Sequence, residues 1–226
     1  MPISFTFDDG RACQVTPGSK VLDEFGLKGT FYVCPGLVRE ERCGWRPGKT
    51  TYELASWAEI KDASRRGHEI GNHSWTHPDF RTETRPARKR SAKWLANFAK
   101  REIVAPAREI RQRIPEWDSL SWAWPCHRVA SPMFKWIEKQ HVGVRPLKPR
   151  GPYSALLSED EHLRRANEFA DMVARTNQWG VATIHAMDGG EGEFSEDLFR
   201  KHLEHVVEIQ GLEVKTVREV FIEASA

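Results

Sequence analysis

Several features that mark other classes of protein are missing from this sequence of 226 residues. No stretch approaches the run of about 18 apolar residues that a membrane-spanning helix needs, which excludes a membrane-embedded protein. Lys and Arg number 34 against 32 Asp and Glu, and a net charge of +2 gives no reason to expect a nucleic-acid partner. Low-complexity tracts are also missing, while 39% hydrophobic residues suffice for a core. We therefore expect a globular protein that binds neither membrane nor nucleic acid.

Cysteine is scarce, and its spacing indicates neither a metal site nor a redox motif. The four cysteines, which form no CxxC pair, are Cys13, Cys34, Cys43 and Cys126. The N-terminal residues also lack the basic segment and apolar core of a secretory signal. We therefore expect a cytoplasmic protein whose thiols are free, because disulfides are rare in that compartment.

Short strand-like runs alternate with longer helical periods along the chain. Strands are predicted at residues 3–7, 30–34, 69–72, 119–124, 142–145, 180–184 and 212–215. Helices are predicted at residues 20–25, 56–67, 88–113, 159–176 and 195–209, with another opening at Ser131-Pro132 and a loop over 39–51. Strand–helix units repeated about seven times predict an α/β fold with a parallel sheet, open or closed into a barrel. A barrel carries its chemistry at the carboxyl ends of the strands.

Carboxylates and imidazoles stand at these strand ends. The candidates follow three of the predicted strands: Asp8 and Asp9 the first, His73 and His77 the third, and His185 the sixth. Two histidines and a carboxylate around an open coordination position form a catalytic metal set that can activate water. Taken singly, Asp-Asp-Gly is more typical of a turn, and a lone histidine is more typical of the core. Their joint occurrence at strand ends favours a site.

The spacing of His73 and His77 admits two backbone arrangements. On a helix, histidines four residues apart share a face and can chelate a metal. The helical zinc-protease motif requires Glu directly after the first histidine, however, and Ser74 stands there. Pro78 also disfavours helical backbone angles at His77. We therefore expect both histidines on a turn that follows a strand.

Five segments of the chain resemble the polysaccharide deacetylase family of carbohydrate esterases. Thr6–Gly10 (TFDDG) and Gly67–Pro78 (GHEIGNHSWTHP) are similar to its first two motifs, with Gly29–Val33 as the strand between them. Ser121–Cys126 (SWAWPC) resembles a variant of the third motif, and Ile184–His185 resembles the last. The first two motifs are specific, and the similarity runs in order through nearly the whole chain.

The resemblance implies a distorted (β/α) barrel with about seven strands, formed by residues 1–226 as a single domain. It implies a hydrolase that removes acetyl groups from N- or O-acetylated sugars or polysaccharide. The family's roles place a divalent metal, most often zinc, on Asp9, His73 and His77. Asp8 is then the general base and His185 the general acid, which suits an imidazole that titrates near neutral pH.

The third motif departs from the family pattern. Its backbone N–H at Cys126 is expected to stabilise the oxyanion, but the family's arginine that orients the base is replaced by Ala123. Arg145 follows a predicted strand and Arg128 follows the motif directly, so either guanidinium could take its place. We expect Arg145 to contact Asp8, because a strand end points at the site more reliably than a loop.

Two other functions fit part of the sequence. One is an amidohydrolase of the same fold that acts on a small non-sugar amide or ureide. This alternative stays open because the family's motif that supports the acid histidine is not evident between Pro132 and Trp179. The other is a catalytically silent carbohydrate-binding protein, which nine scattered tryptophans would suit. Asp8 and His185 argue against it, since binding alone needs neither.

Overall fold

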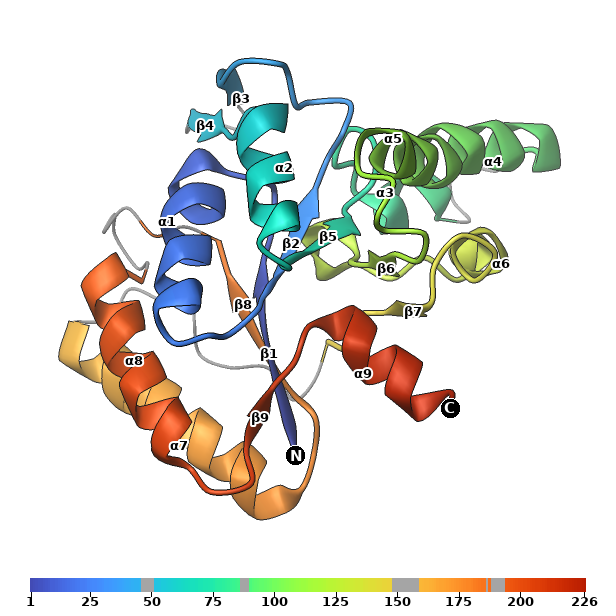
Figure 1. The fold of residues 1–226 in the computed structure, drawn as a ribbon. Coiled ribbons are helices and arrows are strands. Elements are labelled where there is room, and N and C mark those ends of the chain that lie inside the picture. Colours follow the sequence, from blue (N-terminus) through green and yellow to red (C-terminus); the bar gives the residue numbers. More distant parts are fainter. Residues whose placement is uncertain (46–50, 86–89, 148–158, 186, 188–193) are drawn as a thin grey trace.

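A parallel sheet forms the centre of the computed structural model, which describes residues 1–45, 51–85, 90–147, 159–185, 187 and 194–226 (Figure 1). Its strands are β1 (Pro2–Phe7), β2 (Thr30–Val33), β5 (Glu69–Asn72), β6 (Ser121–Trp122), β7 (Gly143–Val144), β8 (Gly180–Ile184) and β9 (Glu213–Val214). They follow the order β7-β6-β5-β2-β1-β8, with β9 also beside β1. All these pairings are parallel. The expected distorted (β/α) barrel is thus confirmed.

Strand β1 organises the sheet because it pairs along both edges. Ile3 is the register partner of both Gly180 in β8 and Val214 in β9, so these two strands lie on opposite edges of β1. Among the described strands no pairing joins β7 to β8, and the barrel stays open there. Because the strands are parallel, their carboxyl ends share one rim.

Helices surround this sheet and bury its faces. They are α1 (Ala12–Glu24), α2 (Trp57–Arg65), α3 (Phe80–Thr84), α4 (Ala92–Ala99), α5 (Ala105–Arg113), α6 (Phe134–Ile137), α7 (Glu159–Thr176), α8 (Glu196–Glu208) and α9 (Val217–Ala224). A π-helical segment, Lys100–Val104, joins α4 to α5, and short 3-10 turns cover Pro125–His127 and Ser131–Met133. In Figure 1, α1, α2, α7 and α8 lie along β1 and β8, while α4 to α6 lie beside β6 and β7.

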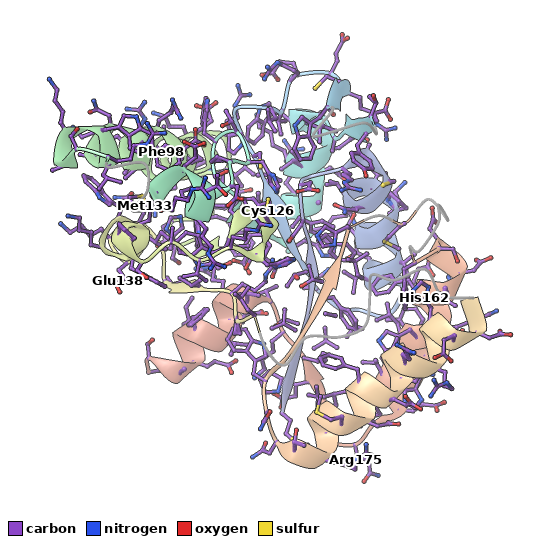
Figure 2. All side chains as sticks on the ribbon, turned by 180° about the vertical axis from the view of Figure 1, so that it is seen from behind. Phe98, Cys126, Met133, Glu138, His162 and Arg175 are labelled. Atoms are coloured by element: carbon purple, nitrogen blue, oxygen red, sulfur yellow. The ribbon has the colours of Figure 1, made fainter. Side chains whose placement is uncertain are left out.

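The buried apolar residues form two clusters, a larger one that includes residues of α1, α2, α5, α7 and α8 and a smaller one around α3, α4 and α6. In the larger cluster, Phe5 of β1 meets Phe199 of α8 edge to face, with ring centroids 5.4 Å apart. The smaller cluster surrounds the buried Trp122 and includes Phe98 and Met133, both labelled in Figure 2. Three of the nine tryptophans are buried in these clusters: Trp57, Trp122 and Trp124.

Helix α1 is longer than the sequence indicates, because it begins at Ala12 rather than at Lys20. Pro17 lies inside this helix and has no backbone N–H to donate, so its presence in the sequence disfavours a helix here. The buried side chains of Val15 and Leu22 pack against the sheet. Tertiary packing therefore outweighs the local penalty.

The segment predicted as a loop over residues 39–51 contains a strand. Strand β3 (Cys43–Trp45) pairs with the antiparallel strand β4 (Tyr52–Leu54), and Trp45 lies opposite Tyr52. Three residues are too few to show an alternating apolar pattern, so no periodicity marks this strand in the sequence. Helices α3 and α9 were not expected either, although Thr216 and Glu219 form a capping box at the start of α9.

Two expectations drawn from missing features can be compared with the structure. All four cysteines are free thiols. In the described part of the chain, no helix is both long and apolar enough to cross a bilayer. The cytoplasmic location stays a prediction.

Candidate active site

All five residues expected to form the site line one pocket of about 210 Å³ at the carboxyl rim of the sheet: Asp8, Asp9, His73, His77 and His185. They arrive from the ends of β1, β5 and β8. The shared rim follows directly from the parallel strands, because each chain segment leaves the sheet on the same side.

Asp9 and two histidines present their ligand atoms to one another. The Oδ1 atom of Asp9 lies 3.2 Å from Nε2 of His77 and 3.6 Å from Nε2 of His73. One ligand atom from each residue lies within 4.8 Å of the others. One oxygen and two nitrogens, with room for water, are the donor set of a catalytic zinc site, so these residues fit a divalent metal.

His73 is held in the form that a metal requires. Its Nδ1–H donates to the carbonyl of Ala123 at 3.0 Å, so the lone pair of Nε2 faces Asp9. Burial lowers the pKa of His73 to about 4, against the opposing effect of the nearby carboxylates. The imidazole is therefore neutral at pH 7. Ala123, which stands in place of the family's arginine, thus helps to orient His73 through its backbone carbonyl.

Arg11 binds the outer oxygen of Asp9. Its Nη2 donates to Oδ2 at 2.8 Å, and its guanidinium lies over the ring of Tyr52, 3.6 Å from the centroid. Oδ1 of Asp9 is thereby left facing the two histidines. Arg11 immediately follows the Asp-Asp-Gly turn, and that proximity was the only sequence signal for its role.

The backbone around the site adopts conformations that cost energy. Asp9, Ser74 and His77 have φ values of 76°, 74° and 57°, in the left-handed region that non-glycine residues rarely adopt. Gly10, at φ 68°, completes the turn after β1, and a Cβ there would come within 3.2 Å of a Val33 methyl. The turn expected at His77 is present. Such strain persists only where the surroundings fix it.

Glu102 fixes the loop that carries His77. This carboxylate is fully buried in the π-helical segment Lys100–Val104. It accepts hydrogen bonds from the backbone N–H of Trp75 at 3.2 Å and of Thr76 at 2.9 Å, and from the Thr76 hydroxyl at 3.0 Å. The wider π turn aims the side chain at this loop, as π-bulges at functional sites often do. No motif or periodicity in the sequence marks Glu102 as a site residue.

Arg145 grips Asp8 with two parallel hydrogen bonds. Its Nη1 donates to Oδ1 and its Nη2 donates to Oδ2 at 2.8 Å. Both side chains are almost completely buried. The contact expected between Arg145 and Asp8 is therefore present, and it links the residues that follow β7 and β1. Arg128 instead pairs with Asp79, at 2.5 Å.

The charge state of Asp8 follows from this pairing. Burial alone would raise the pKa of Asp8, but the charge of Arg145 and its hydrogen bonds, together with the nearby histidines, hold it well below its usual value. Asp8 is therefore ionised at neutral pH, with a guanidinium fixing the plane of the carboxylate.

Two histidines flank Asp8 on its exposed side. Nε2 of His185 lies 3.9 Å from Oδ2 of Asp8, and Nε2 of His127 lies 4.0 Å from the same atom. Their rings meet edge to face, with centroids 5.8 Å apart. Burial lowers the pKa of His185. His127 was not predicted, although it follows the third motif directly.

Asp8, His127 and His185 also bring ligand atoms within 4.8 Å of one another. A second metal is nonetheless disfavoured there, because the guanidinium of Arg145 already contacts both oxygens of Asp8. The backbone supports a site role for the third-motif turn, since Cys126 and His127 have φ values of 55° and 53°. Cys126 lines the pocket and is labelled in Figure 2.

The β3–β4 hairpin supplies an aromatic wall. Trp45 and Tyr52 line the pocket, and the Trp45 ring lies edge-on to His77 with centroids 5.3 Å apart. Trp45 is thus one tryptophan that presents an aromatic surface to the pocket.

The α/β barrel thus carries an Asp–His–His set that fits a divalent metal, beside a second aspartate held by Arg145. Residues 1–118 match the family described as polysaccharide deacetylase, and the chain belongs to that family. It is 35% identical over 79 residues to the peptidoglycan-N-acetylglucosamine deacetylase PgdA of Listeria monocytogenes, covering 34% of this chain and 14% of that protein. The match thus spans only a small part of that relative's length.

Two solved structures illustrate the shared fold. A family 4 acetyl xylan esterase from Clostridium thermocellum, in complex with a cobalt ion, has a TM-score of 0.65 at 18% identity, covering 100% of this chain and 93% of that one. A CE4 family pseudoenzyme from Bacillus anthracis has a TM-score of 0.62 at 15% identity, covering 97% of this chain and 64% of that one. At these identities the likeness shows the fold alone.

Proposed function

We propose that residues 1–226 form one catalytic domain that uses a divalent metal, most often zinc in such a donor set, to remove acetyl groups from N- or O-acetylated sugars or polysaccharide. Membership in the polysaccharide deacetylase family supports this reaction class. PgdA is named for an amide substrate and the acetyl xylan esterase for an ester, so both linkages are included in the proposal.

Asp9, His73 and His77 would hold the metal, because their ligand atoms already converge. When bound, the metal would polarise the acetyl carbonyl and lower the pKa of a coordinated water toward ~7. Arg11 would keep Asp9 in place by its bond to the outer oxygen. Glu102 would do the same for His77 through the loop that it holds.

Asp8 would accept the proton of the attacking water as general base. Each of its oxygens bonds to Arg145 and retains a further lone pair for that proton. His185, which lines the same pocket, would donate a proton to the leaving amine or alcohol. The backbone N–H of Cys126 would donate to the oxyanion of the tetrahedral intermediate.

The single observation that carries this proposal is the buried Asp8–Arg145 pair beside the converging Asp9, His73 and His77. Carbohydrate binding alone needs no buried carboxylate held by a guanidinium. Burying such an ion pair carries a desolvation penalty, and a role in catalysis would account for its presence. The pair therefore favours an enzyme over the catalytically silent alternative.

The test is acetate release by zinc-loaded protein from N-acetylglucosamine oligomers and from acetylated xylan, with a cyclic ureide as the competing substrate class. Asp8→Asn and His185→Ala should each lower turnover by about 10² to 10⁴-fold at unchanged metal content. Full activity in either variant would mean that the roles are wrongly assigned. Hydrolysis of the ureide, with no acetate from any sugar, would support the amidohydrolase instead.

A further inference from the structure

A second cavity, of about 760 Å³, opens beside the candidate active site. Its lining comes from α3 and the residue after it, and from residues 128–132, which follow the third motif. Arg81, Arg85 and Arg128 are its charged residues. We refer to this cavity as the arginine groove.

The arginine groove continues the loop that forms the active-site wall. His127 lines the active-site pocket and the next residue, Arg128, lines the groove. Arg128 is fixed by its ion pair to Asp79, which caps α3 and lies two residues after His77. A substrate that extends beyond the reacting acetyl group can therefore pass from one cavity into the other along this loop.

The charges of Arg81 and Arg85 in the groove are uncompensated. No acidic residue is among the described residues that line it. Within the described part of the chain, neither Arg81 nor Arg85 makes an ion pair, and both are exposed. Since the whole protein carries a net charge of only +2, this surplus is local. Unpaired guanidiniums around a cavity are suited to carboxylate and phosphate oxygens.

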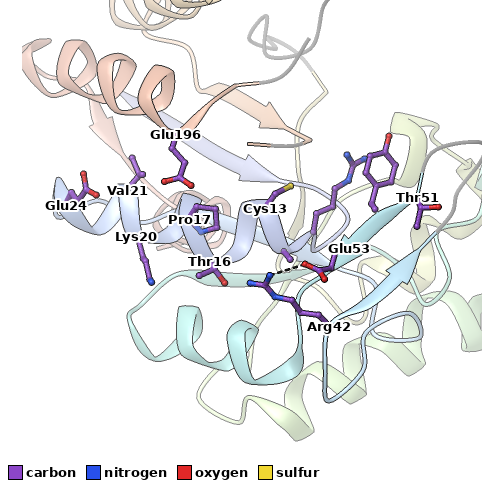
Figure 3. A pocket seen from close by; sticks show the side chains of 13 residues that line it. Cys13, Thr16, Pro17, Lys20, Val21, Glu24, Arg42, Thr51, Glu53 and Glu196 are labelled. Carbon is purple, nitrogen blue, oxygen red and sulfur yellow. Dashed lines mark hydrogen bonds and ion pairs between the residues drawn. The ribbon is translucent and has the colours of Figure 1, made fainter. Parts of the chain in front are cut away.

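A third cavity, of about 600 Å³ along α1, shows the contrasting case (Figure 3). It too is lined by basic residues, but acidic residues line it in equal measure. Arg42 pairs there with Glu53 and with Glu59, and Glu24 pairs with Arg200. Arg42 and Glu24 are thus neutralised by other side chains of the protein, and the arginine groove is the better site for an anion.

The groove also offers an apolar surface. Val129 is 37% exposed, one of only four large hydrophobic residues in the described chain that are this accessible, and Pro132 lies beside it in the lining. Pyranose rings carry C–H groups on their faces, so a sugar with an anionic substituent matches both the apolar and the charged parts of this lining.

We propose that the arginine groove binds a carboxylate or phosphate group on a sugar unit near the one that is deacetylated, so that the substrate is an acidic glycan. This inference rests on the proposed deacetylase function. Arg81 and Arg85 contact the anionic group, and Arg128 is positioned by Asp79 at the entrance from the active site.

The test measures binding of metal-loaded protein to three oligosaccharides of equal length. One is neutral (N-acetylglucosamine), one carries carboxylates (alternating N-acetylglucosamine and glucuronate), and one carries phosphates (phosphate-linked N-acetylglucosamine). An Arg81→Glu/Arg85→Glu variant is compared with Arg164→Glu/Arg165→Glu, which makes the same charge change on the exposed face of α7. Calorimetry gives the affinities, and thermal unfolding verifies that each variant is folded.

The parent should bind at least one anionic oligosaccharide about tenfold more tightly than the neutral one. The source of the anion is identified by whichever arm is preferred. The Arg81/Arg85 variant should lose this preference while the Arg164/Arg165 variant keeps it. Equal affinity for all three oligosaccharides, or equal losses in both variants, would overturn the proposal. Single-stranded DNA is titrated in the same way, and binding tighter than that of either anionic glycan would also overturn the proposal.

Acetate release measured in the same samples separates this inference from the proposed function. Acetate released from the neutral oligomer without any anionic preference would retain the deacetylase and reject the groove. A clear anionic preference without acetate release from any oligosaccharide would retain the groove and reject the deacetylase.

Discussion

Replacing Arg145 tests the most specific contact of the site. The Arg145→Met variant leaves the Asp8 carboxylate, only 2% exposed, without a counter-charge. Breaking a buried ion pair by removing one partner costs about 3–5 kcal/mol of folding free energy, because the remaining charge is uncompensated. The Arg145→Lys variant keeps the charge but loses the fork that bonds both oxygens, so its loss of stability should be smaller.

Turnover should respond to the lost geometry in both variants. A base displaced by about 1 Å can cost ~10²-fold in rate, so we expect Arg145→Lys to lower turnover by about 10 to 100-fold. Metal content should not change, because in the described part of the chain Arg145 makes no hydrogen bond to Asp9, His73 or His77. Urea unfolding, acetate release and metal analysis on the same preparations measure the three quantities.

Arg128→Met is the matched control. This arginine is 55% exposed and pairs with Asp79 near the surface, so its loss should cost about 0–1 kcal/mol of stability. A double variant, Asp8→Asn with Arg145→Met, should be more stable than the sum of the single losses by about 2 kcal/mol. Parent-like turnover in Arg145→Lys, or strictly additive stabilities, would refute the idea that this pair orients Asp8.

Three further outcomes are expected. Glu102→Gln should weaken zinc binding about tenfold, because Glu102 orients the loop that carries the ligand His77. Zinc titration measures this loss, and an unchanged affinity would show that the loop keeps its conformation without the Glu102 carboxylate. Burial lowers the pKa of His141 to about 3, whereas its pKa in the unfolded chain is ~6.5. Between these two values the unfolded chain binds a proton that the folded protein does not, so the free energy of unfolding should fall by up to ~1.4 kcal/mol per pH unit as the pH drops from ~6.5 toward 3. Urea unfolding from pH 7 to 4 should show a flatter profile for His141→Gln, and parallel profiles would reject this origin. Thiol titration of unfolded, unreduced protein should find all four cysteines, whereas a Cys34–Cys43 bridge would contradict it.

The sequence predicts the elements that are long or sharply bounded. Helix α7 and strands β5 and β8 have the bounds that the pattern indicates, because buried parallel strands and amphipathic helices leave clear apolar periods. The capping box of Ser56 and Glu59 likewise marks the start of α2. The three-residue strands β3 and β4 leave no such period, so the aromatic wall of the pocket was missed.

Within the site, predictability follows distance along the chain. The Asp8–Asp9 pair and the His73–His77 pair stand in local motifs, and the fold then brings the motifs together. Glu102 contacts the loop of His77 from a π-helical segment. That segment is defined by tertiary packing, and no local sequence pattern predicts it. Arg145 could be selected because a strand end fixed its direction, even though 137 residues separate it from Asp8.

Whether the converging Asp9, His73 and His77 hold a metal that catalysis requires is decided by zinc titration of metal-free protein, with metal content and acetate release measured in parallel. We expect one zinc per chain, acetate release that rises in proportion to occupancy, and loss of both in a folded His77→Ala variant, because His77 supplies one of the three converging ligand atoms. Zinc bound as tightly by His77→Ala as by the parent, or full acetate release from metal-free protein, would contradict it.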